Sequence, residues 1–410
     1  MNPFFRNLFS ETECKKIILN IRFPERVLCP KCSYHKIYEL RHKLHFYKCK
    51  KCLSIFNEKT GTLFENRRIS LNKWFCAFYL LHFNKNFTSV RLAKILGITQ
   101  SSAWYILEKI KKEKDRKLIN EIKKYVKAIE SQKAKPFVLW SGSKRLVLQE
   151  LFCRLPKSFN NYFEPFLGGG SLFFALANEL KVEKCFYISD INKELITSYE
   201  VVKNNATELA QYLEDHKQSY SEQYYYHVRD NLICENDIDV ASRFLFLNKT
   251  CFNGLYKTNN KGEFTGSFGH KQASVILDEG NFLAGSRLLK NENVNISNGT
   301  YHNIENNVKE GDFVYFDPPY FHYHNRDSYV DYVGGKKFNQ KDEQIKLRDF
   351  IFSLHDKGVK IMFSNSNTEF ICDLFAHKDF NIDVIKVKRN ISHVGRNRGF
   401  EEEIIVRNYK

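Results

Sequence analysis

A short apolar run that ends at two consecutive prolines constrains the fold of this chain more than any other feature. The run is Phe-Val-Tyr-Phe at residues 313–316, and it leads directly into Asp317, Pro318, Pro319 and Tyr320. Four bulky apolar residues bounded in this way are typical of a buried strand. Because the prolines fix φ and donate no backbone N–H, they cannot continue that strand. The sequence therefore predicts a sheet strand that ends in an acidic and an aromatic side chain.

These four residues suit the methylation of an exocyclic nucleobase amine. Such a nitrogen is a poor nucleophile because its lone pair is delocalised into the ring. The Asp317 carboxylate and the Pro318 carbonyl can accept its two N–H bonds, which draws the lone pair out of conjugation and directs it at a methyl donor. Tyr320 offers a flat face to a base that has left its stack. The same residue types also occur at ordinary strand-to-turn junctions, so the motif alone leaves both interpretations open.

Charge and length divide the chain. Its 410 residues exceed one typical core and predict at least two domains. Residues 1–135 contain 30 Lys and Arg against 11 Asp and Glu, whereas residues 136–410 contain 34 and 36. Such a basic segment favours nucleic acid as a partner over a merely solvated surface.

The cellular compartment can also be predicted from composition. No apolar stretch is long enough to span a bilayer, and no cleavage-site pattern follows the first residues, so we expect a cytoplasmic protein that does not associate with membranes. Eleven cysteines in that compartment indicate metal ligands and buried thiols rather than disulfides.

Four of these cysteines have the spacing of a zinc site. They form two Cys-x-x-Cys pairs, Cys29 with Cys32 and Cys49 with Cys52, which are separated by sixteen residues. Two thiolates on each tight turn can complete a closed tetrahedral site, which makes the ion structural rather than catalytic. Residues 1–66 are therefore predicted to be a zinc ribbon, with free buried thiols or a redox pair as the alternatives.

Helical periodicity follows the ribbon. In residues 87–104, a short helix is expected to begin at a Thr/Ser cap and to stop at Gly97, and a second to begin at Thr99. This pattern predicts a helix-turn-helix within residues 67–113, with Gln100 and Ser101 at the leading end of a DNA-reading helix. A plain three-helix bundle would show the same pattern. The Lys-rich residues 114–134 indicate a charged helical linker.

The N-terminal segment resembles the zinc-ribbon and helix-turn-helix head of a group of insertion-sequence transposases. The resemblance covers residues 7–112 and rests on CPKC, CKKC, GTLF, LNKW and LAKILG. Those transposases continue into a nuclease domain with an acidic triad, which has no visible counterpart here.

From residue 135 the pattern alternates between strands and helices, as in an α/β sheet. A short strand ends at Glu164 and Phe166 and leads into a glycine loop that contains Gly168 and Gly170. The next strand closes at Asp190, twenty residues after Gly170, where a carboxylate can accept hydrogen bonds from ribose hydroxyls. A glycine loop would also fit a dinucleotide, although Gly-Gly-Gly is not the dinucleotide fingerprint.

Residues 135–410 resemble the Dam-like family of DNA N6-adenine methyltransferases. The strings that carry the resemblance lie at residues 136–144, 164–171, 190–192, 244–256, 261–264, 317–320, 363–368 and 403–409. The family implies a Rossmann-like sheet, S-adenosyl-L-methionine as methyl donor, and direct in-line transfer to a flipped adenine. The donor-binding residues expected from the matched motifs are Trp140, Lys144, Glu164, Phe166, Gly168, Gly170, Asp190 and Asp317.

The family places its target-reading segment within residues 200–275. By the matched motif, Leu255, Lys257, Ser267 and His270 are expected to contact bases. Relatives that recognise GATC commonly have Arg where Lys257 stands, and Lys lacks the two-pronged grip that Arg offers guanine. Despite this difference, the resemblance makes GATC the leading target. A phosphate contact by Lys257 is the alternative to a base contact.

We therefore expect a DNA adenine methyltransferase with an added DNA-binding head that acts on double-stranded DNA at the nucleoid. A cognate restriction endonuclease is a further expected partner. Three alternatives remain at this point. They are transfer to N4 of cytosine, a DNA-binding regulator with a decayed catalytic half, and a transposase.

Overall fold

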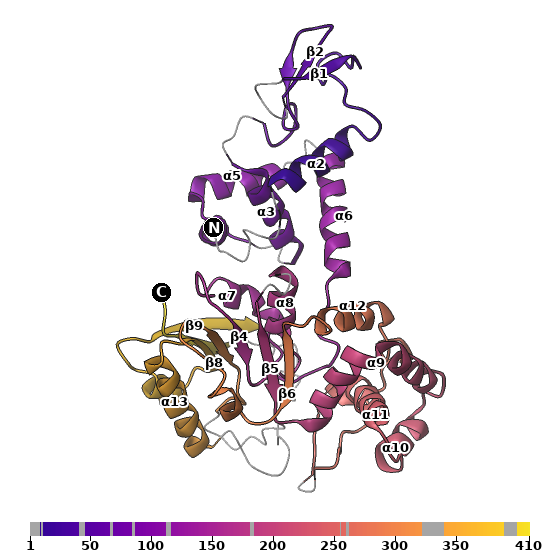
Figure 1. The fold of residues 1–410 in the computed structure, drawn as a ribbon, viewed down its shortest axis with the longest axis vertical. Helices are drawn as coiled ribbons and strands as arrows, with labels where there is room; N and C mark the ends of the chain where they lie inside the picture. Colours follow the sequence, from indigo (N-terminus) through magenta and orange to yellow (C-terminus); the bar gives the residue numbers. More distant parts are fainter. Residues whose placement is uncertain are drawn as a thin grey trace. The chain divides into compact units, whose positions relative to one another are not determined.

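The computed structural model describes residues 9, 11–40, 46–65, 69–83, 87–111, 116–180, 184–254, 256–259, 262–321, 340–388 and 400–410. The chain forms two compact units, Met1–Gln132 and Lys133–Lys410 (Figure 1). Within the described ranges, no helix combines the length and the apolar character needed to cross a membrane.

The first unit contains a three-stranded antiparallel sheet. Its strands are β1 (Ile37–Glu39), β2 (Tyr47–Cys49) and β3 (Ile55–Phe56), with β2 in the middle. The buried residues of this small sheet are Cys29, Cys49 and Phe56. So small an apolar cluster supplies little folding free energy, which is the usual situation of a domain that a metal stabilises.

The remaining elements in the described part of this unit are helices. They are α2 (Glu11–Arg22), α3 (Leu71–Phe83), α4 (Ser89–Leu96), α5 (Gln100–Lys111) and α6 (Arg116–Gln132). Glu11 joins two of them, since its carboxylate accepts the backbone N–H groups of Leu71 and Asn72 at 3.1 and 3.0 Å. The N-terminal end of the α3 dipole is positive, so it also stabilises the negative charge of Glu11.

The segment predicted to be a charged linker is largely helix α6, and it belongs to the core of the first unit. Its apolar residues Leu118, Ile119, Ile122 and Val126 are buried, and the helix packs against α2 and α3. The described lysines that make this helix basic lie on its solvent-facing side. Its apolar stripe makes it a structural element rather than a free connector.

A seven-stranded sheet is the centre of the second unit. Its order is β6-β5-β4-β7-β8-β10-β9, and the strands from β6 to β8 run parallel, whereas β10 and β9 are antiparallel. The strands are β4 (Tyr162–Glu164), β5 (Phe186–Asp190), β6 (Val294–Asn298), β7 (Phe313–Phe316), β8 (Lys360–Ser366), β9 (Asn381–Lys388) and β10 (Phe400–Arg407). This mainly parallel sheet confirms the predicted α/β class.

The topology of the sheet explains where a site can form. The chain moves outward from β4 through β5 to β6, and then returns to pair β7 with the other side of β4. The carboxyl ends of β4 and β7 therefore meet where the strand order reverses, which is where ligands bind in open α/β sheets. The predicted strand at residues 313–316 is β7, and all four of its residues are buried.

Helices pack around this sheet (Figure 1). They are α7 (Leu148–Phe152), α8 (Ser171–Glu179), α12 (Glu279–Leu289), α13 (Lys341–Asp356) and α14 (Glu369–Leu374). On one side, Leu347, Ile351 and Leu354 of α13 join the core cluster that contains Val314 of β7 and Ile361 of β8. A further group beside β6 consists of α9 (Lys193–Gln218), α10 (Glu222–Asp230) and α11 (Asp237–Thr250).

The segment that follows α11 turns back on itself. Two isolated antiparallel bridges join Cys251 to Phe268 and Thr258 to Phe264. The Thr265 N–H also donates to the Lys257 carbonyl at 2.8 Å. The described residues of this segment are thus paired by only a few antiparallel contacts.

Candidate active site and metal centre

Asp317 lies immediately after β7 and pairs with a lysine from a distant part of the chain. Lys144 begins the short 3-10 turn Lys144–Leu146, and its Nζ lies 2.8 Å from Asp317 Oδ1. The same ammonium donates to the Gly142 carbonyl at 2.7 Å and lies 4.7 Å from the centroid of the Tyr320 ring. Among the described residues, the Lys144 ammonium is the partner found for this buried oxygen, which accepts no further hydrogen bond from them.

The environment of Asp317 determines its charge. Burial raises the pKa of Asp317 to about 6, the Lys144 ammonium opposes that shift, and the negative charge of Glu403 adds to it. The side chain is still 19% exposed, so a ligand can reach it. At neutral pH the carboxylate form therefore predominates, as an acceptor of amine N–H bonds requires.

The Tyr320 ring is held by its hydroxyl group, which donates to Glu403 Oε2 of β10 at 2.8 Å. Sequence reasoning placed residues 403–409 in the terminal strand and missed the contact of Glu403 with the site. The available signal was a glutamate directly before the apolar part of this strand. An acidic residue that is only 7% exposed in a sheet needs a polar partner.

The predicted glycine loop connects β4 to α8. Gly168 and Gly170 have φ values of 48° and 64°, which favour glycine. A Cβ on Gly168 would lie 2.5 Å from the Trp140 ring, so the loop and this aromatic residue lie in close contact. Asp190, at the end of β5, accepts the Gly168 N–H and the Asn192 N–H at 2.9 Å each. Three predicted donor-site segments thus converge at one edge of the sheet.

Two further residues expected at the donor site lie before this loop, one at the end of β4 and one in the turn that follows it. Glu164 is buried and accepts the Tyr162 hydroxyl at 2.7 Å. Burial raises the pKa of Glu164 to about 8, and the charge of Asp317 contributes to the rise. Phe166 stacks on Tyr301 with centroids 5.7 Å apart.

The residues present fit a cationic methyl donor. Asp317 and Glu164 are both largely buried acidic groups, and burial raises the pKa of each, so a positive charge on a ligand beside them would favour their carboxylate forms. Gly168 has no side chain, so a ligand at this edge of the sheet can approach its backbone closely. A ligand that carries a positive sulfur beside an adenosine would satisfy these groups.

The predicted target-reading residues have different surroundings. Leu255 lies outside the described residues. Lys257 is partly buried, whereas Ser267 and His270 are exposed, and His270 has a φ of 50°. Two of the four predicted side chains are therefore exposed, where DNA could contact them.

Two residues that sequence reasoning did not assign join this segment to the donor side. The Asn248 side chain exchanges hydrogen bonds with the N–H and the carbonyl of Leu139, at 2.8 and 2.7 Å. Tyr256 stacks on Trp140 with centroids 5.8 Å apart. An amide in the otherwise apolar end of α11 was the sequence signal for Asn248.

The four predicted metal ligands form one cluster. Their Sγ atoms all lie within 4.8 Å of one another, and the pairs Cys29–Cys52 and Cys32–Cys49 are 3.5 and 3.6 Å apart. Zinc–sulfur bonds of about 2.3 Å in a tetrahedron require sulfur atoms about 3.8 Å apart, which these distances approach. The residue after each pair, Ser33 or Leu53, has a φ of 56° or 58°, so both turns have the same geometry.

The helix-turn-helix elements begin and end as predicted. The Thr88 side chain caps α4 by accepting a backbone N–H at 3.3 Å, and Gly97 ends the helix with a φ of 58°. Gln100 and Ser101 lie exposed in the first turn of α5. Trp104, one turn further on, is 56% exposed, which is unusual for a tryptophan. Sequence reasoning did not assign Trp104 to this face.

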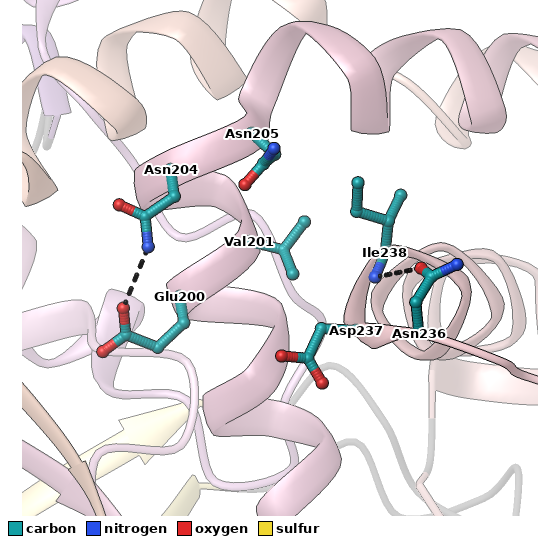
Figure 2. Close-up of a pocket in the computed structure, with 7 residues that line it drawn as sticks. All are labelled: Glu200, Val201, Asn204, Asn205, Asn236, Asp237 and Ile238. Carbon is teal, nitrogen blue, oxygen red and sulfur yellow. Dashed lines mark hydrogen bonds between the residues drawn. The ribbon is translucent and has the colours of Figure 1, made fainter.

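An open pocket of about 340 Å³ lies between α9 and the start of α11 (Figure 2). Its lining residues are Glu200, Val201, Asn204, Asn205, Asn236, Asp237 and Ile238. Asn236 caps α11 by accepting the Ile238 N–H at 2.9 Å, and Asn204 donates to Glu200 at 3.4 Å. The pocket contains none of the predicted site residues. The two hydrogen bonds lie within α9 and at the start of α11, so these polar groups stabilise the helices.

Comparisons with known proteins assign different families to the two units of the chain. Residues 140–391 match the D12 class of N6 adenine-specific DNA methyltransferases, and residues 9–54 match a transposase zinc-ribbon domain.

Individual relatives resemble the second unit in length. The type II methyltransferase M1.LlaDCHI of Lactococcus lactis subsp. cremoris is 35% identical over 67% of this chain and 95% of its own length. The type II methyltransferase M.MjaIII of Methanocaldococcus jannaschii is 37% identical over 67% and 99%. A DNA adenine methylase of Haemophilus influenzae is 28% identical over 67% and 93%.

Proposed function

Because the chain belongs to the D12 class of N6-adenine-specific DNA methyltransferases, we propose that it transfers a methyl group from S-adenosyl-L-methionine to N6 of adenine in duplex DNA by direct in-line transfer. The observation that supports this mechanism most is the position of Asp317, Pro318, Pro319 and Tyr320 at the reversal of strand order, beside the loop of Gly168. The described cysteines are not needed as nucleophiles in this mechanism.

The chain's own groups would activate the amine by orientation. Asp317 accepts one N6–H bond and the Pro318 carbonyl accepts the other, so the lone pair is directed away from the adenine ring. The Tyr320 ring stacks on the extruded base. When bound, S-adenosyl-L-methionine supplies an electrophilic methyl group. Orientation of this kind can account for several kcal/mol of the barrier, of the roughly 7–11 kcal/mol reachable by positioning.

The donor would be held by residues from three segments. Trp140 and Lys144 border its amino-acid end, and Asp190 accepts hydrogen bonds from its ribose. Each Asp190 oxygen already accepts one backbone N–H and retains a second lone pair for a hydroxyl group. Glu164, Phe166, Gly168 and Gly170 would form the remaining wall, as the resemblance implies.

We propose GATC as the leading target sequence, read by the segment that carries Leu255, Lys257, Ser267 and His270. Lysine at position 257 can contact one guanine acceptor or a phosphate, but it cannot form the planar two-pronged contact of arginine. The type II names of two relatives favour a role beside a restriction endonuclease.

The first unit would act as a DNA-binding accessory. We propose that Cys29, Cys32, Cys49 and Cys52 bind one structural zinc ion. The α5 face that carries Gln100, Ser101 and Trp104 would enter the major groove. The favourable observation is a capped turn, with Thr88 and Gly97 at its ends, that presents this exposed face in a strongly basic segment.

Modification sequencing would test the activity and the target together. DNA from a methylation-deficient bacterium that expresses the chain should carry N6-methyladenine at one motif, and the mark should be absent with Asp317→Ala. N4-methylcytosine instead would identify the cytosine alternative. If a folded, zinc-loaded protein leaves no mark, the proposed activity fails and a decayed regulator becomes the better description.

A further inference from the structure

The backbone around Tyr320 is held by side chains from three elements that are distant in sequence. Gln344 lies on α13, Asn365 on β8 and Glu403 on β10. All three are buried, with exposures of 2%, 0% and 7%. Buried amides and carboxyl groups are costly unless their hydrogen bonds are made, so each of these three side chains requires hydrogen-bonding partners.

The orientation of the Asn365 amide follows from its neighbours. Its Oδ1 accepts the backbone N–H groups of Phe321 and Ser366, at 3.0 and 2.8 Å. Because a backbone N–H can only donate, this atom must be the oxygen, and Nδ2 must point the other way.

The orientation of Asn365 in turn determines that of Gln344. Asn365 Nδ2 donates to Gln344 Oε1 at 3.0 Å, so the remaining Gln344 Nε2 faces the Pro319 carbonyl and donates to it at 3.1 Å. The two amides thus form a directional relay that holds the carbonyl before Tyr320 and the N–H after it.

The far end of the Tyr320 side chain is held independently by the hydroxyl hydrogen bond to Glu403 at 2.8 Å. With the backbone fixed on both sides and the hydroxyl fixed at the tip, the plane of the ring has little freedom. The Pro319 carbonyl is occupied by Gln344, so the carbonyl proposed to accept the adenine amine is that of Pro318.

We propose that Gln344, Asn365 and Glu403 are positioning residues that hold the Pro318–Tyr320 backbone and the Tyr320 ring in the orientation that methyl transfer requires. They act through Tyr320 and the proline carbonyls and do not themselves touch the substrate. The inference rests on the proposed function of the same site. A misplacement of about 1 Å can lower a rate by about 100-fold, so loss of this support should appear in kcat more than in KM.

The sharpest test substitutes Gln344 with glutamate and with methionine in the full chain. In Gln344→Glu, a neutral carboxylic acid can still donate to the Pro319 carbonyl, whereas the carboxylate would repel it. Gln344→Met has a similar size and cannot donate at any pH. Single-turnover methylation of a duplex with the target identified by sequencing would be measured from pH 6 to pH 9, always as a ratio to wild type.

The single-turnover rate constant of Gln344→Glu, as a ratio to wild type, should fall on the order of 10- to 100-fold at high pH and recover as the pH is lowered. For Gln344→Met the loss should be of similar size and independent of pH. Gln340→Glu is the matched control on the same helix, because Gln340 is exposed at the helix start and makes no side-chain cap. Its ratio should stay near one throughout.

A second arm examines the ring. Glu403→Gln keeps an acceptor for the Tyr320 hydroxyl and should retain kcat at its pH optimum, whereas Glu403→Ala should lower it. With 2-aminopurine at the target position, Glu403→Ala should change the fluorescence of the extruded base without abolishing DNA binding.

The inference is overturned if Gln344→Met methylates at the wild-type rate, or if a folded Gln344→Glu protein shows a ratio that does not vary with pH. Should Gln344→Glu fail to fold, Gln344→Met decides alone. Wild-type protein that leaves no methyl mark would instead remove the proposed function itself, so the two failures can be distinguished.

Discussion

The charge of Asp317 depends on two neighbours with opposite effects. Lys144 lies 2.8 Å away and favours the carboxylate, whereas Glu403 disfavours it. Burial raises the pKa of Asp317 to about 6, which lies near the lower edge of the physiological range. The acid form has one N–H acceptor fewer, so protonation should impair activation of the adenine amine.

We expect Lys144→Met and Glu403→Gln to move the acid limb of kcat/KM in opposite directions. Removing the ammonium raises the pKa of Asp317 and shifts the limb to higher pH. Removing the like charge lowers that pKa and shifts the limb to lower pH. Rates across pH 5–8 at low substrate concentration would measure both shifts, with Lys346→Met as an exposed lysine control. Shifts of the same sign would contradict this assignment.

A second prediction at this scale concerns proton release. Burial raises the pKa of Glu164 to about 8, so the free protein holds this proton at neutral pH. A cationic donor beside Glu164 would lower its pKa, and binding should release protons near pH 7. Titration calorimetry in two buffers with different ionisation enthalpies measures the number released.

S-adenosyl-L-homocysteine is the matched ligand for this experiment, because it lacks the positive sulfur and should release fewer protons. Glu164→Gln removes the titrating group and should reduce the release further. Net proton uptake on binding of the charged donor would show that Glu164 does not border the sulfonium.

At the scale of elements, the zinc ribbon and the seven-stranded sheet are stabilised in different ways. The ribbon buries few apolar residues around its four cysteines, whereas the sheet has an extensive apolar core on the side of α13. Loss of metal should therefore affect the first element and spare the second.

We expect Cys49→Ser to abolish zinc binding and to unfold the ribbon while the methyltransferase unit stays folded. A structural zinc site supplies on the order of 10 kcal/mol of folding free energy in small domains, more than this cluster can replace. Zinc content by mass spectrometry and differential scanning calorimetry would show the loss. Cys234→Ser, a cysteine in the second unit, is the control, and retention of zinc by Cys49→Ser would contradict the assignment.

The α5 face can be tested through the salt dependence of DNA binding. Lys94 is exposed on α4, and its replacement by Gln should reduce the slope of log K against log salt by about 0.9 if it contacts a phosphate. Gln100→Ala and Trp104→Ala should reduce sequence preference with little change in slope, because base contacts carry the specificity. Unchanged binding in all three variants would exclude this face.

At the scale of the whole molecule, the chain joins a basic unit to a nearly neutral one. Residues 1–135 carry the whole positive excess, and residues 136–410 resemble complete methyltransferases in length. About two thirds of this chain covers 95% and 99% of the length of these two relatives.

A protein that begins at Lys133 should therefore fold and methylate the same motif as the full chain. Without the basic unit its affinity for DNA should fall, and the loss should be greatest at low salt. Filter binding at several salt concentrations and modification sequencing would compare the two proteins. A folded truncated protein that methylates a different motif would show that the head selects the target.

Several local features of this protein could be predicted from short stretches of its sequence. These features depend on backbone angles and burial patterns within a few residues. They are the paired cysteines, the Thr88 cap, the Gly97 stop and the strand before Asp317. Such features are encoded locally because φ preferences and side-chain periodicity act over one turn or one strand. The same reasoning predicted a helix in residues 114–134, which is present as α6, but it did not identify the buried apolar stripe by which α6 packs against α2 and α3.

Only the tertiary structure brought together the groups that determine the chemistry of the site. Lys144 meets Asp317, and Glu403 meets Tyr320, across 173 and 83 residues of chain, because the strand order places their elements at one edge of the sheet. Local patterns carry no information about such approaches. The pKa of Asp317 and the orientation of Tyr320 were therefore decided by packing between distant elements, since charge and hydrogen bonding depend on distance in space rather than along the chain.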